Sequence, residues 1–224
     1  MTTPPAWIRT LALGALVLLS MVLGAALRPL LVADDPDPAP VLDPNEIAFV
    51  QDMVAHHEQA LIMTQQLDPG TDPVVTRLAQ QIRDGQNAEL GTMLGWLRLS
   101  GVTPTNPEPM AWMQGPRAAV GHGHHETSDA GTPDPMPGMA TRTELDALAA
   151  ARGRDAAVLF LQLMQRHHVG GVTMAQAAEQ RLPDGPVRQT AREMITEQSQ
   201  EAGTMALMLS QLDAPLLPVN AGGG

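Results

Sequence analysis

Apolar residues follow a helical period along most of the chain after residue 43. In the first such stretch they recur at spacings of three, four and seven, at Ile47, Val50, Val54, Leu61 and Leu67. This spacing places them on one face of a helix. Asp43, Pro44 and Glu46 resemble the capping box that begins a helix.

Turn-forming residues separate this helix from four further predicted helices. The sequence Asp-Pro-Gly-Thr-Asp-Pro at 68–73 ends the first, and Leu-Pro-Asp-Gly-Pro at 182–186 forms a similar break. Helical stretches follow at about 73–100, 142–151, 155–181 and 187–212. The intervening residues 101–140 are rich in Gly, Pro, His and Met and form a long connection, which is usually functional or disordered.

One motif occurs twice, at positions 111 residues apart. It reads Phe-x-x-x-Met-x-x-His-His, with a further Met at the same offset, and its residues are Phe49, Met53, His56, His57 and Met63, then Phe160, Met164, His167, His168 and Met174. A second repeat, Gln-x-x-Glu-x-x-x-Met, lies in the helix after each copy, at Gln86, Glu89 and Met93 and at Gln198, Glu201 and Met205. The chain is thus predicted to be all-α, with two duplicated helical hairpins that pack as a four-helix bundle.

The N-terminal part has a different character. Residues 10–27 contain no charged residue and follow Arg9, a length at which signal peptides and membrane helices overlap. Gly24-Ala25-Ala26 could be cleaved, whereas the apolar stretch that continues to Ala33 favours an uncleaved anchor. We predict residues 1–33 as signal peptide or membrane anchor, 34–42 as linker, 43–212 as the duplicated domain (halves about 43–100 and 141–212), and 213–224 as a flexible tail.

Composition narrows the possible functions. The 13 basic and 24 acidic residues give a net charge of −11, which argues against nucleic-acid binding. The chain has no cysteine, so disulfides, thiolate metal sites and thiol catalysis are excluded. An acidic body of this kind attracts cations, although charge alone does not define a function.

The doubled motif carries the side chains that soft or borderline metals select, imidazole nitrogen and thioether sulfur. On a helix, Met53, His56 and Met63 share one stripe, and His57 lies about 100° around the axis. The second copy repeats this arrangement. Each Met taken alone is more typical of flexible core packing, but burying two adjacent imidazoles twice is costly unless they are bonded or coordinated.

The partner helices and the connection supply further candidates. Gln86, Glu89 and Met93 share a face, as do Gln198, Glu201 and Met205, and they could add a ligand or orient the imidazoles by hydrogen bonds. Weaker candidates lie in the connection, which is either a metal-capturing segment or a plain linker: His122, His124, His125, Met136 and Met139.

Two metal chemistries lack their motifs. Di-iron bundles use Glu-x-x-His on two helices, and that pattern does not occur in the sequence. The zinc-protease pattern His-Glu-x-x-His is also missing, because His57-Glu58 is not followed by His at position 61.

The doubled Phe-x-x-x-Met-x-x-His-His-x-x-Ala-x-x-Met pattern resembles domain-of-unknown-function family 305 over about residues 43–212. The resemblance implies a ferritin-like, usually exported bundle, and some members are linked to periplasmic copper binding. This chain departs from the pattern at Gly171, where Ala is usual, and at Val169-Gly170, which replace the polar pair Glu58-Gln59. The second site is therefore expected to be less polar or differently shaped.

The leading hypothesis is an exported, non-enzymatic protein that sequesters or hands on copper, as Cu(I) or Cu(II). His56, His57, His167 and His168 are its first candidate ligands, followed by Met53, Met63, Met164 and Met174. The alternatives are a ferritin-like redox enzyme with a His-rich metal centre and a structural envelope protein without metal. The expected partners are the metal ion and, if residues 10–27 are uncleaved, the membrane; the sequence identifies no protein partner.

Overall fold

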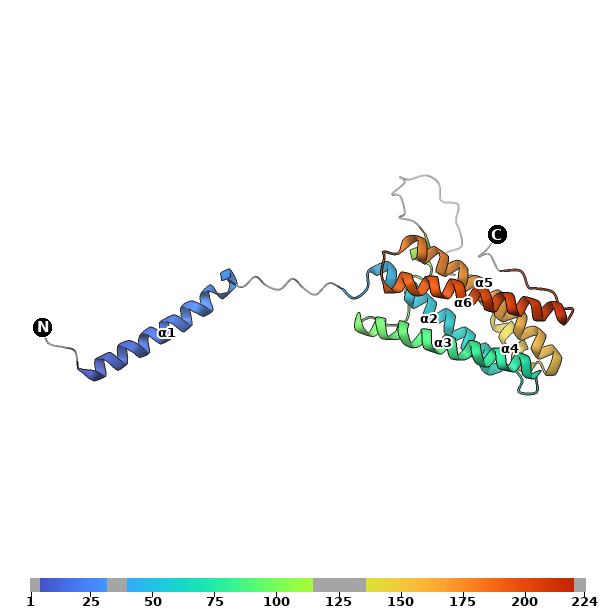
Figure 1. The fold of residues 1–224 in the computed structure, drawn as a ribbon, viewed down its shortest axis with the longest axis horizontal. Helices are drawn as coiled ribbons and strands as arrows, with labels where there is room; N and C mark the ends of the chain where they lie inside the picture. Colours follow the sequence, from blue (N-terminus) through green and yellow to red (C-terminus); the bar gives the residue numbers. More distant parts are fainter. Residues whose placement is uncertain (1–4, 32–39, 115–135, 220–224) are drawn as a thin grey trace, which may run out of the picture. The chain divides into compact units, whose positions relative to one another are not determined.

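The computed structural model describes residues 5–31, 40–114 and 136–219 (Figure 1). The chain divides into two units, residues 1–40 and residues 41–224. Across the described ranges it contains six α-helices and one short 3-10 helix, and no β-strand. The prediction of an all-α chain is confirmed.

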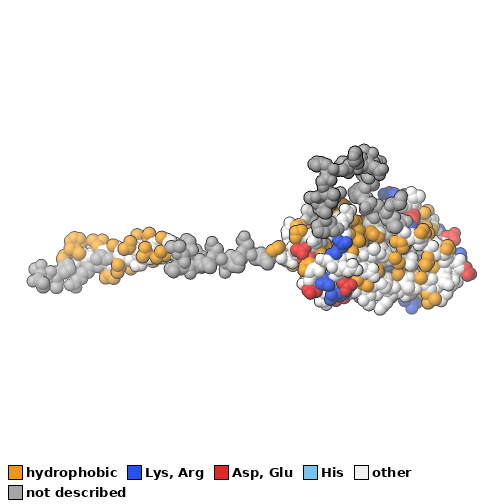
Figure 2. All heavy atoms as spheres, turned by 90° about the horizontal axis from the view of Figure 1, so that it is seen from above, with side chains coloured by type: hydrophobic (Ala, Val, Ile, Leu, Met, Phe, Trp, Pro, Cys, Tyr) orange, Lys and Arg blue, Asp and Glu red, His pale blue; other side chains and the backbone are white. Residues whose placement is uncertain are grey.

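The first unit consists of helix α1 (Ala6–Leu31). Figure 2 shows apolar side chains along this helix, and Leu18 and Met21 are 68% and 71% exposed. Within the described residues, no helix combines the length and the apolar character needed to cross a membrane. The interpretation of residues 1–33 as signal peptide or anchor stays a prediction.

Helices α2 (Pro44–Gln66) and α3 (Pro73–Leu99) form the first hairpin of the second unit (Figure 1). The predicted capping box is present at the start of α2. The Asp43 carboxylate accepts from the backbone N–H of Glu46 at 2.9 Å, and the Glu46 carboxylate accepts from the backbone N–H of Asp43, also at 2.9 Å. Such a cap stabilises a helix by about 1 kcal/mol.

Helices α5 (Gly153–Arg181) and α6 (Pro186–Gln211) form the second hairpin, and the short helix α4 (Arg142–Ala150) precedes it. The sequence predicts that this helix begins at about residue 155. In the structure Gly153 has φ +53°, a conformation that glycine adopts at little cost. It turns the chain directly into α5, two residues before the predicted start.

The two hairpins meet where α2 packs against α5. In the part of the chain that the structure describes, buried side chains form two core clusters. Cluster A includes Phe49, Met53, Met93, Trp112, Met174 and Met194. Cluster B includes Met63, Ile82, Phe160, Met164 and Met205. Both clusters draw residues from both hairpins, so neither hairpin buries its apolar face alone.

The beginning of the predicted connection 101–140 is held on α2 by a buried carboxylate. Asp52 accepts hydrogen bonds from the Asn106 side-chain amide at 2.9 Å and from the Met110 backbone N–H and the Trp112 indole N–H, both at 2.8 Å. Trp112 belongs to the 3-10 helix η1 (Ala111–Met113). This part of the connection is therefore a fixed element of the domain.

The C-terminal segment also contacts the domain as far as the structure describes it. The Gln162 side-chain amide donates to the Pro215 carbonyl at 2.7 Å, and Leu217 packs against cluster B. We predicted a flexible tail from residue 213, but residues 215–217 are docked on α5 and the core. Burial of the apolar Leu217 side chain against the core favours this position over an extended one in solvent.

Candidate metal centre

The four motif histidines lie in the middle of α2 and α5, where these helices pack against each other. Their side chains are fully or almost fully buried, with exposures of 0% for His56, His57 and His168 and 1% for His167. Imidazoles bury poorly without partners. Each of the four is accordingly held by a hydrogen bond through its Nε2 atom.

His56 and His167 stack on each other across the contact between the two hairpins. Their ring centroids are 3.7 Å apart and the ring planes differ by 29°. His167 Nε2 donates to the backbone carbonyl of His56 at 3.0 Å, while His56 Nε2 donates to the carbonyl of Pro137 at 3.2 Å. The sequence did not predict this stack, because the two residues are brought together only by the packing of α2 on α5.

His57 and His168 form two equivalent pairs with glutamates of the neighbouring helices. His57 Nε2 lies 2.6 Å from Glu89 Oε2 on α3, and His168 Nε2 lies 2.7 Å from Glu201 Oε2 on α6. The glutamate side chains are 16% and 20% exposed. The repeated Gln-x-x-Glu-x-x-x-Met segments thus place one glutamate against one histidine of each pair, and both glutamates are partly exposed to solvent.

All four imidazoles leave the other ring nitrogen, Nδ1, buried and without a hydrogen-bond partner. Carbonyl and carboxylate oxygens accept protons, so each Nε2 carries the hydrogen, and a neutral ring then presents a lone pair at Nδ1. Burial lowers the pKa of His56 to about 3, and the charge of nearby His57 lowers it further. Burial also lowers the pKa of His167 well below its ordinary value, and electrostatic repulsion from His56 is the next largest cause. His56 and His167 are therefore neutral, lone-pair-bearing rings near pH 7.

The fold divides the candidate methionines between clusters A and B. Met53, Met63, Met164 and Met174 are all 0% exposed. The two members of one sequence copy do not share a cluster: the set Met53, Met93 and Met174 belongs to cluster A, and the set Met63, Met164 and Met205 belongs to cluster B. Each set thus combines the Met before one His pair with the Met after the other.

The two glutamines of the partner helices, Gln86 and Gln198, are buried and not fully bonded. Gln86 Oε1 and both polar atoms of Gln198 have no hydrogen-bond partner. A side chain at Gly171 would place its Cβ 2.2 Å from Gln198 Oε1 and 3.1 Å from His56 Cε1. Because Gly171 replaces the usual Ala and has no side chain, the Gln198 amide can occupy this space next to His56.

The segment that contains the weak candidates Met136 and Met139 contacts this region closely. We call residues Met136–Thr141 the strap. A Cβ on Gly138, which has φ +78°, would lie 2.4 Å from the Arg166 carbonyl, and a Cβ on Gly170 would lie 2.0 Å from the Pro137 carbonyl. Only glycine at both positions allows the strap backbone to approach α5 this closely.

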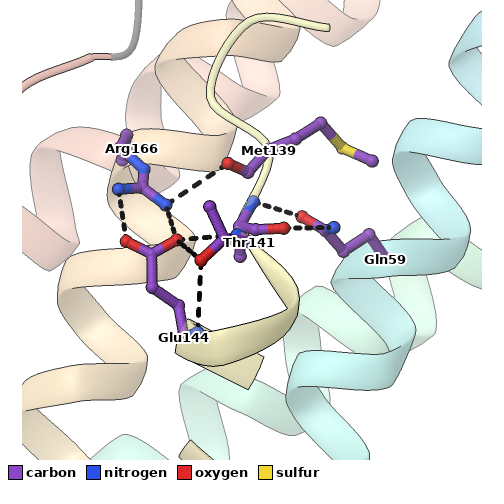
Figure 3. Close-up of polar contacts among 6 residues, drawn as sticks. Gln59, Met139, Thr141, Glu144 and Arg166 are labelled. Atoms are coloured by element: carbon purple, nitrogen blue, oxygen red, sulfur yellow. Dashed lines mark hydrogen bonds and ion pairs between the residues drawn. The ribbon is translucent and has the colours of Figure 1, made fainter. Parts of the chain in front are cut away.

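The strap is fixed by two polar contacts, which Figure 3 shows. The Gln59 amide on α2 both donates to and accepts from the backbone of Ala140, at 2.9 and 2.6 Å. The buried Arg166 guanidinium on α5 bonds both Glu144 carboxylate oxygens, at 2.8 and 2.7 Å, and donates to the Met139 carbonyl at 3.3 Å.

The remaining weak candidates of the connection are only partly placed. Met136 and Met139 are half-buried residues of the strap, whereas His122, His124 and His125 lie outside the described residues. Sequence reasoning missed Pro137, Gly138, Glu144 and Arg166. The one available signal was the Val169-Gly170 departure from the repeat, which coincides with the place where the strap lies on α5.

The donor atoms fit a soft ion better than a hard one. Among the described residues, no group of three or more His, Asp or Glu side chains is arranged to hold one ion. Hard cations need many oxygen ligands, and the buried donors here are lone-pair nitrogens and thioethers. Thioethers select Cu(I), and imidazoles accept copper in either oxidation state. Imidazole Nδ1 and Met sulfur are therefore the buried donor types in this domain that copper would take.

Comparison with known proteins identifies one family and two similar solved structures. The profile of the family described as "Domain of unknown function (DUF305)" matches residues 46–209. Among solved structures, the "putative secreted protein DUF305" of Streptomyces coelicolor is 34% identical, with a TM-score of 0.66 over 78% of this chain and 97% of that one. A DUF305 fragment from Deinococcus radiodurans is 28% identical, with a TM-score of 0.58 over 75% and 97%. No curated protein matches the sequence.

Proposed function

This chain belongs to the DUF305 family, and we propose that it is an exported, non-enzymatic protein that binds copper inside a ferritin-like four-helix bundle of two duplicated hairpins. The family assignment carries no activity with it. The proposal therefore depends on the chemistry of the buried side chains.

The observation that carries the proposal is the common orientation of the four imidazoles. His56, His57, His167 and His168 all use Nε2 for a hydrogen bond and leave Nδ1 buried and unpartnered. An unsatisfied buried polar atom costs about 1–3 kcal/mol, so four of them in one core are unexpected for a purely structural site. A metal that takes Nδ1 as ligand would offset this cost. The Nε2 hydrogen bonds would then orient the ligands.

The methionines extend the ligand set in a way that uses both hairpins. Met53 and Met174 lie in cluster A, and Met63 and Met164 lie in cluster B. We propose that a copper ion in either cluster takes its thioethers from both sequence copies, with Met93 or Met205 available in addition. Binding would then join the two hairpins and stabilise the domain by mass action.

Export is supported by two independent features. The apolar, uncharged stretch at residues 10–27 is typical of a signal peptide or an anchor, and the Streptomyces coelicolor relative is described as a "putative secreted protein". We propose that the domain works in the cell envelope or outside the cell, with the membrane as partner if the N-terminal segment is retained.

Titration of the full chain with Cu(I) and with Cu(II) tests the proposal. We expect binding of Cu(I), and replacement of all four motif histidines by Gln should reduce its affinity by more than the ~10- to 100-fold loss that follows removal of an outer-shell partner. Circular dichroism checks that the variant keeps its helices. Unchanged copper affinity in a folded variant would refute the histidine assignment.

A methionine pair tests the thioether ligands with a matched control. Met174→Leu and Met194→Leu both change a fully buried residue of cluster A, and both nearly conserve side-chain volume. Only Met174 belongs to the repeated motif. We expect Met174→Leu alone to lower the Cu(I) affinity. Equal affinities in the two variants would leave Met174 as a core residue and remove the thioethers from the proposed site.

A further inference from the structure

The strap gives His56 a partner that no other motif histidine has. His57 and His168 bond glutamates of neighbouring helices, and His167 bonds the main chain of the facing helix. His56 alone bonds the strap, through the carbonyl of Pro137. This contact bridges 81 residues of sequence and has no counterpart in the repeat.

The position of the Pro137 carbonyl is set by contacts of the residues that follow it. Gly138, the next residue, packs on the α5 backbone so closely that a Cβ there would also lie 3.0 Å from the Cα atoms of His167 and Gly170. Further along the chain, Glu144 bonds Arg166, and the Arg166 guanidinium also donates a hydrogen bond to the Met139 carbonyl (Figure 3). The carbonyl therefore has little freedom to move unless one of these contacts is lost.

The hydrogen bond from His56 to Pro137 has a chemical consequence. A carbonyl can only accept, so the contact keeps the imidazole hydrogen on Nε2 and the lone pair on Nδ1. Without the carbonyl, the hydrogen could sit on either nitrogen, and the ring could turn about its side-chain bonds. The strap contact thereby decides which nitrogen of His56 is available as a ligand.

We propose that Gly138, Glu144 and Arg166 are positioning residues that hold the strap carbonyl of Pro137 on His56 and so present His56 Nδ1 to a metal. The proposal rests on the proposed copper function, but the positioning is a property of the metal-free protein. It makes the two sequence copies unequal, because only the copy in α2 has an imidazole oriented by the connection.

The test uses the full chain labelled with nitrogen-15 at histidine, first without metal. Long-range proton–nitrogen correlation spectra distinguish the two tautomers of each ring. Wild type should show His56 with its hydrogen on Nε2. Glu144→Gln, which removes the carboxylate partner of Arg166, and Gly138→Ala should shift His56 toward a mixture of tautomers while His57 and His168 stay unchanged.

Two control variants carry matched changes away from the strap. Asp146→Asn removes a carboxylate from the same short helix α4, at an exposed pair with Arg142. Gly91→Ala adds a methyl group to a glycine with open space around it. Neither should alter the His56 signals. If Gly138→Ala does not fold, Glu144→Gln alone decides the outcome.

Copper titration of the same variants separates the two proposals. With correct positioning, Glu144→Gln should weaken Cu(I) binding by about 10-fold, the lower end of the effect of an outer-shell partner, and Asp146→Asn should not. A changed tautomer in a protein that binds no copper would support the positioning and refute the copper function. An unchanged His56 tautomer in folded Glu144→Gln and Gly138→Ala would overturn the positioning, whatever copper does.

Discussion

Helices α2 and α5 carry the same motif, yet they differ wherever they meet a segment outside the repeat. Gln59 on α2 and Gly170 on α5 are equivalent positions, and both contact the strap. The Gln59 amide forms two hydrogen bonds with it, whereas Gly170 lets the strap backbone approach because it has no side chain. Asp52 on α2 holds the connection after α3, whereas its equivalent Leu163 on α5 is an apolar core residue.

The parts that face the centre of the domain are the ones that stay alike. Both halves keep the adjacent histidines, and His57–Glu89 and His168–Glu201 differ by only 0.1 Å in length (2.6 and 2.7 Å). The repeat has thus been preserved in the His–Glu pair within each hairpin and lost where α2 and α5 contact the connection 101–140. Substitutions at equivalent positions can test this division.

Asp52 should give the largest difference between the halves. Asp52→Leu reproduces the residue at the equivalent position 163, but it leaves the donors of Met110 and Trp112 without an acceptor and the Asn106 amide with only the Ala48 carbonyl at 3.5 Å. At about 1–3 kcal/mol for each buried unsatisfied donor, we expect a loss of on the order of 4 kcal/mol in the free energy of unfolding, measured by denaturant titration.

Asp52→Asn is the matched control for that change. It keeps one acceptor oxygen and removes a charge that burial makes unfavourable, since desolvation raises the pKa of Asp52. Its loss of stability should be well below that of Asp52→Leu. Equal stability of wild type and Asp52→Leu would mean that the Asp52 contacts do not hold the connection.

Gly170 and Gln59 should respond differently to the same new residue, alanine. Gly170→Ala places a methyl group against the strap backbone, with 2.0 Å to the Pro137 carbonyl oxygen. We expect a cost of about 3 kcal/mol, at the upper end of the range for overpacking. Gln59→Ala loses two hydrogen bonds to Ala140 and should cost about 1–2 kcal/mol. Unfolding curves that rank the two variants in the opposite order would place the strap's main support on α2.

The Arg166–Glu144 contact should add a contribution to the free energy of unfolding that is lost in acid. Only the second half has this contact. Hydrogen bonding to Arg166 lowers the pKa of Glu144 from 4.5 to about 2. In the unfolded chain this carboxyl protonates near its ordinary value, so the contribution is complete above about pH 4.5 and is lost as the pH falls to about 2. Because Glu144 is partly exposed, solvent screening reduces it to about 1 kcal/mol.

The measurement is the unfolding free energy of wild type and Glu144→Gln across this pH range. Protonation of His56 and His167 in the unfolded chain destabilises both proteins below pH 6.5 and cancels in the difference. The difference should be present at pH 6 and shrink toward zero near pH 2. A difference that does not change with pH would show that the Glu144 charge is not what stabilises the strap.

The sequence predicted the features that follow from local rules. The helix period, the Asp43 cap and the spacing of the repeat were sufficient to predict the hairpins. They also indicated that Glu89 could bond a histidine of the first pair. The strap contact on His56, the His56–His167 stack and the burial of Asp52 depend on the packing of distant segments. No local pattern distinguishes Asp52 from an exposed helical carboxylate, so its role could be seen only in the structure.

The smallest effect is expected where the two halves should behave identically. Gly91 on α3 and Gly203 on α6 occupy equivalent positions of the second repeat, both are exposed, and a Cβ at either would meet open space. Alanine in place of a helical glycine reduces the backbone freedom of the unfolded chain and should stabilise the protein by about 0.5–1 kcal/mol at each position. Two equal increments in the midpoint of denaturant unfolding would show that α3 and α6 belong to one cooperative domain. A gain from Gly91→Ala with none from Gly203→Ala would instead show that the second hairpin unfolds separately, so that the difference between the halves extends beyond the connections.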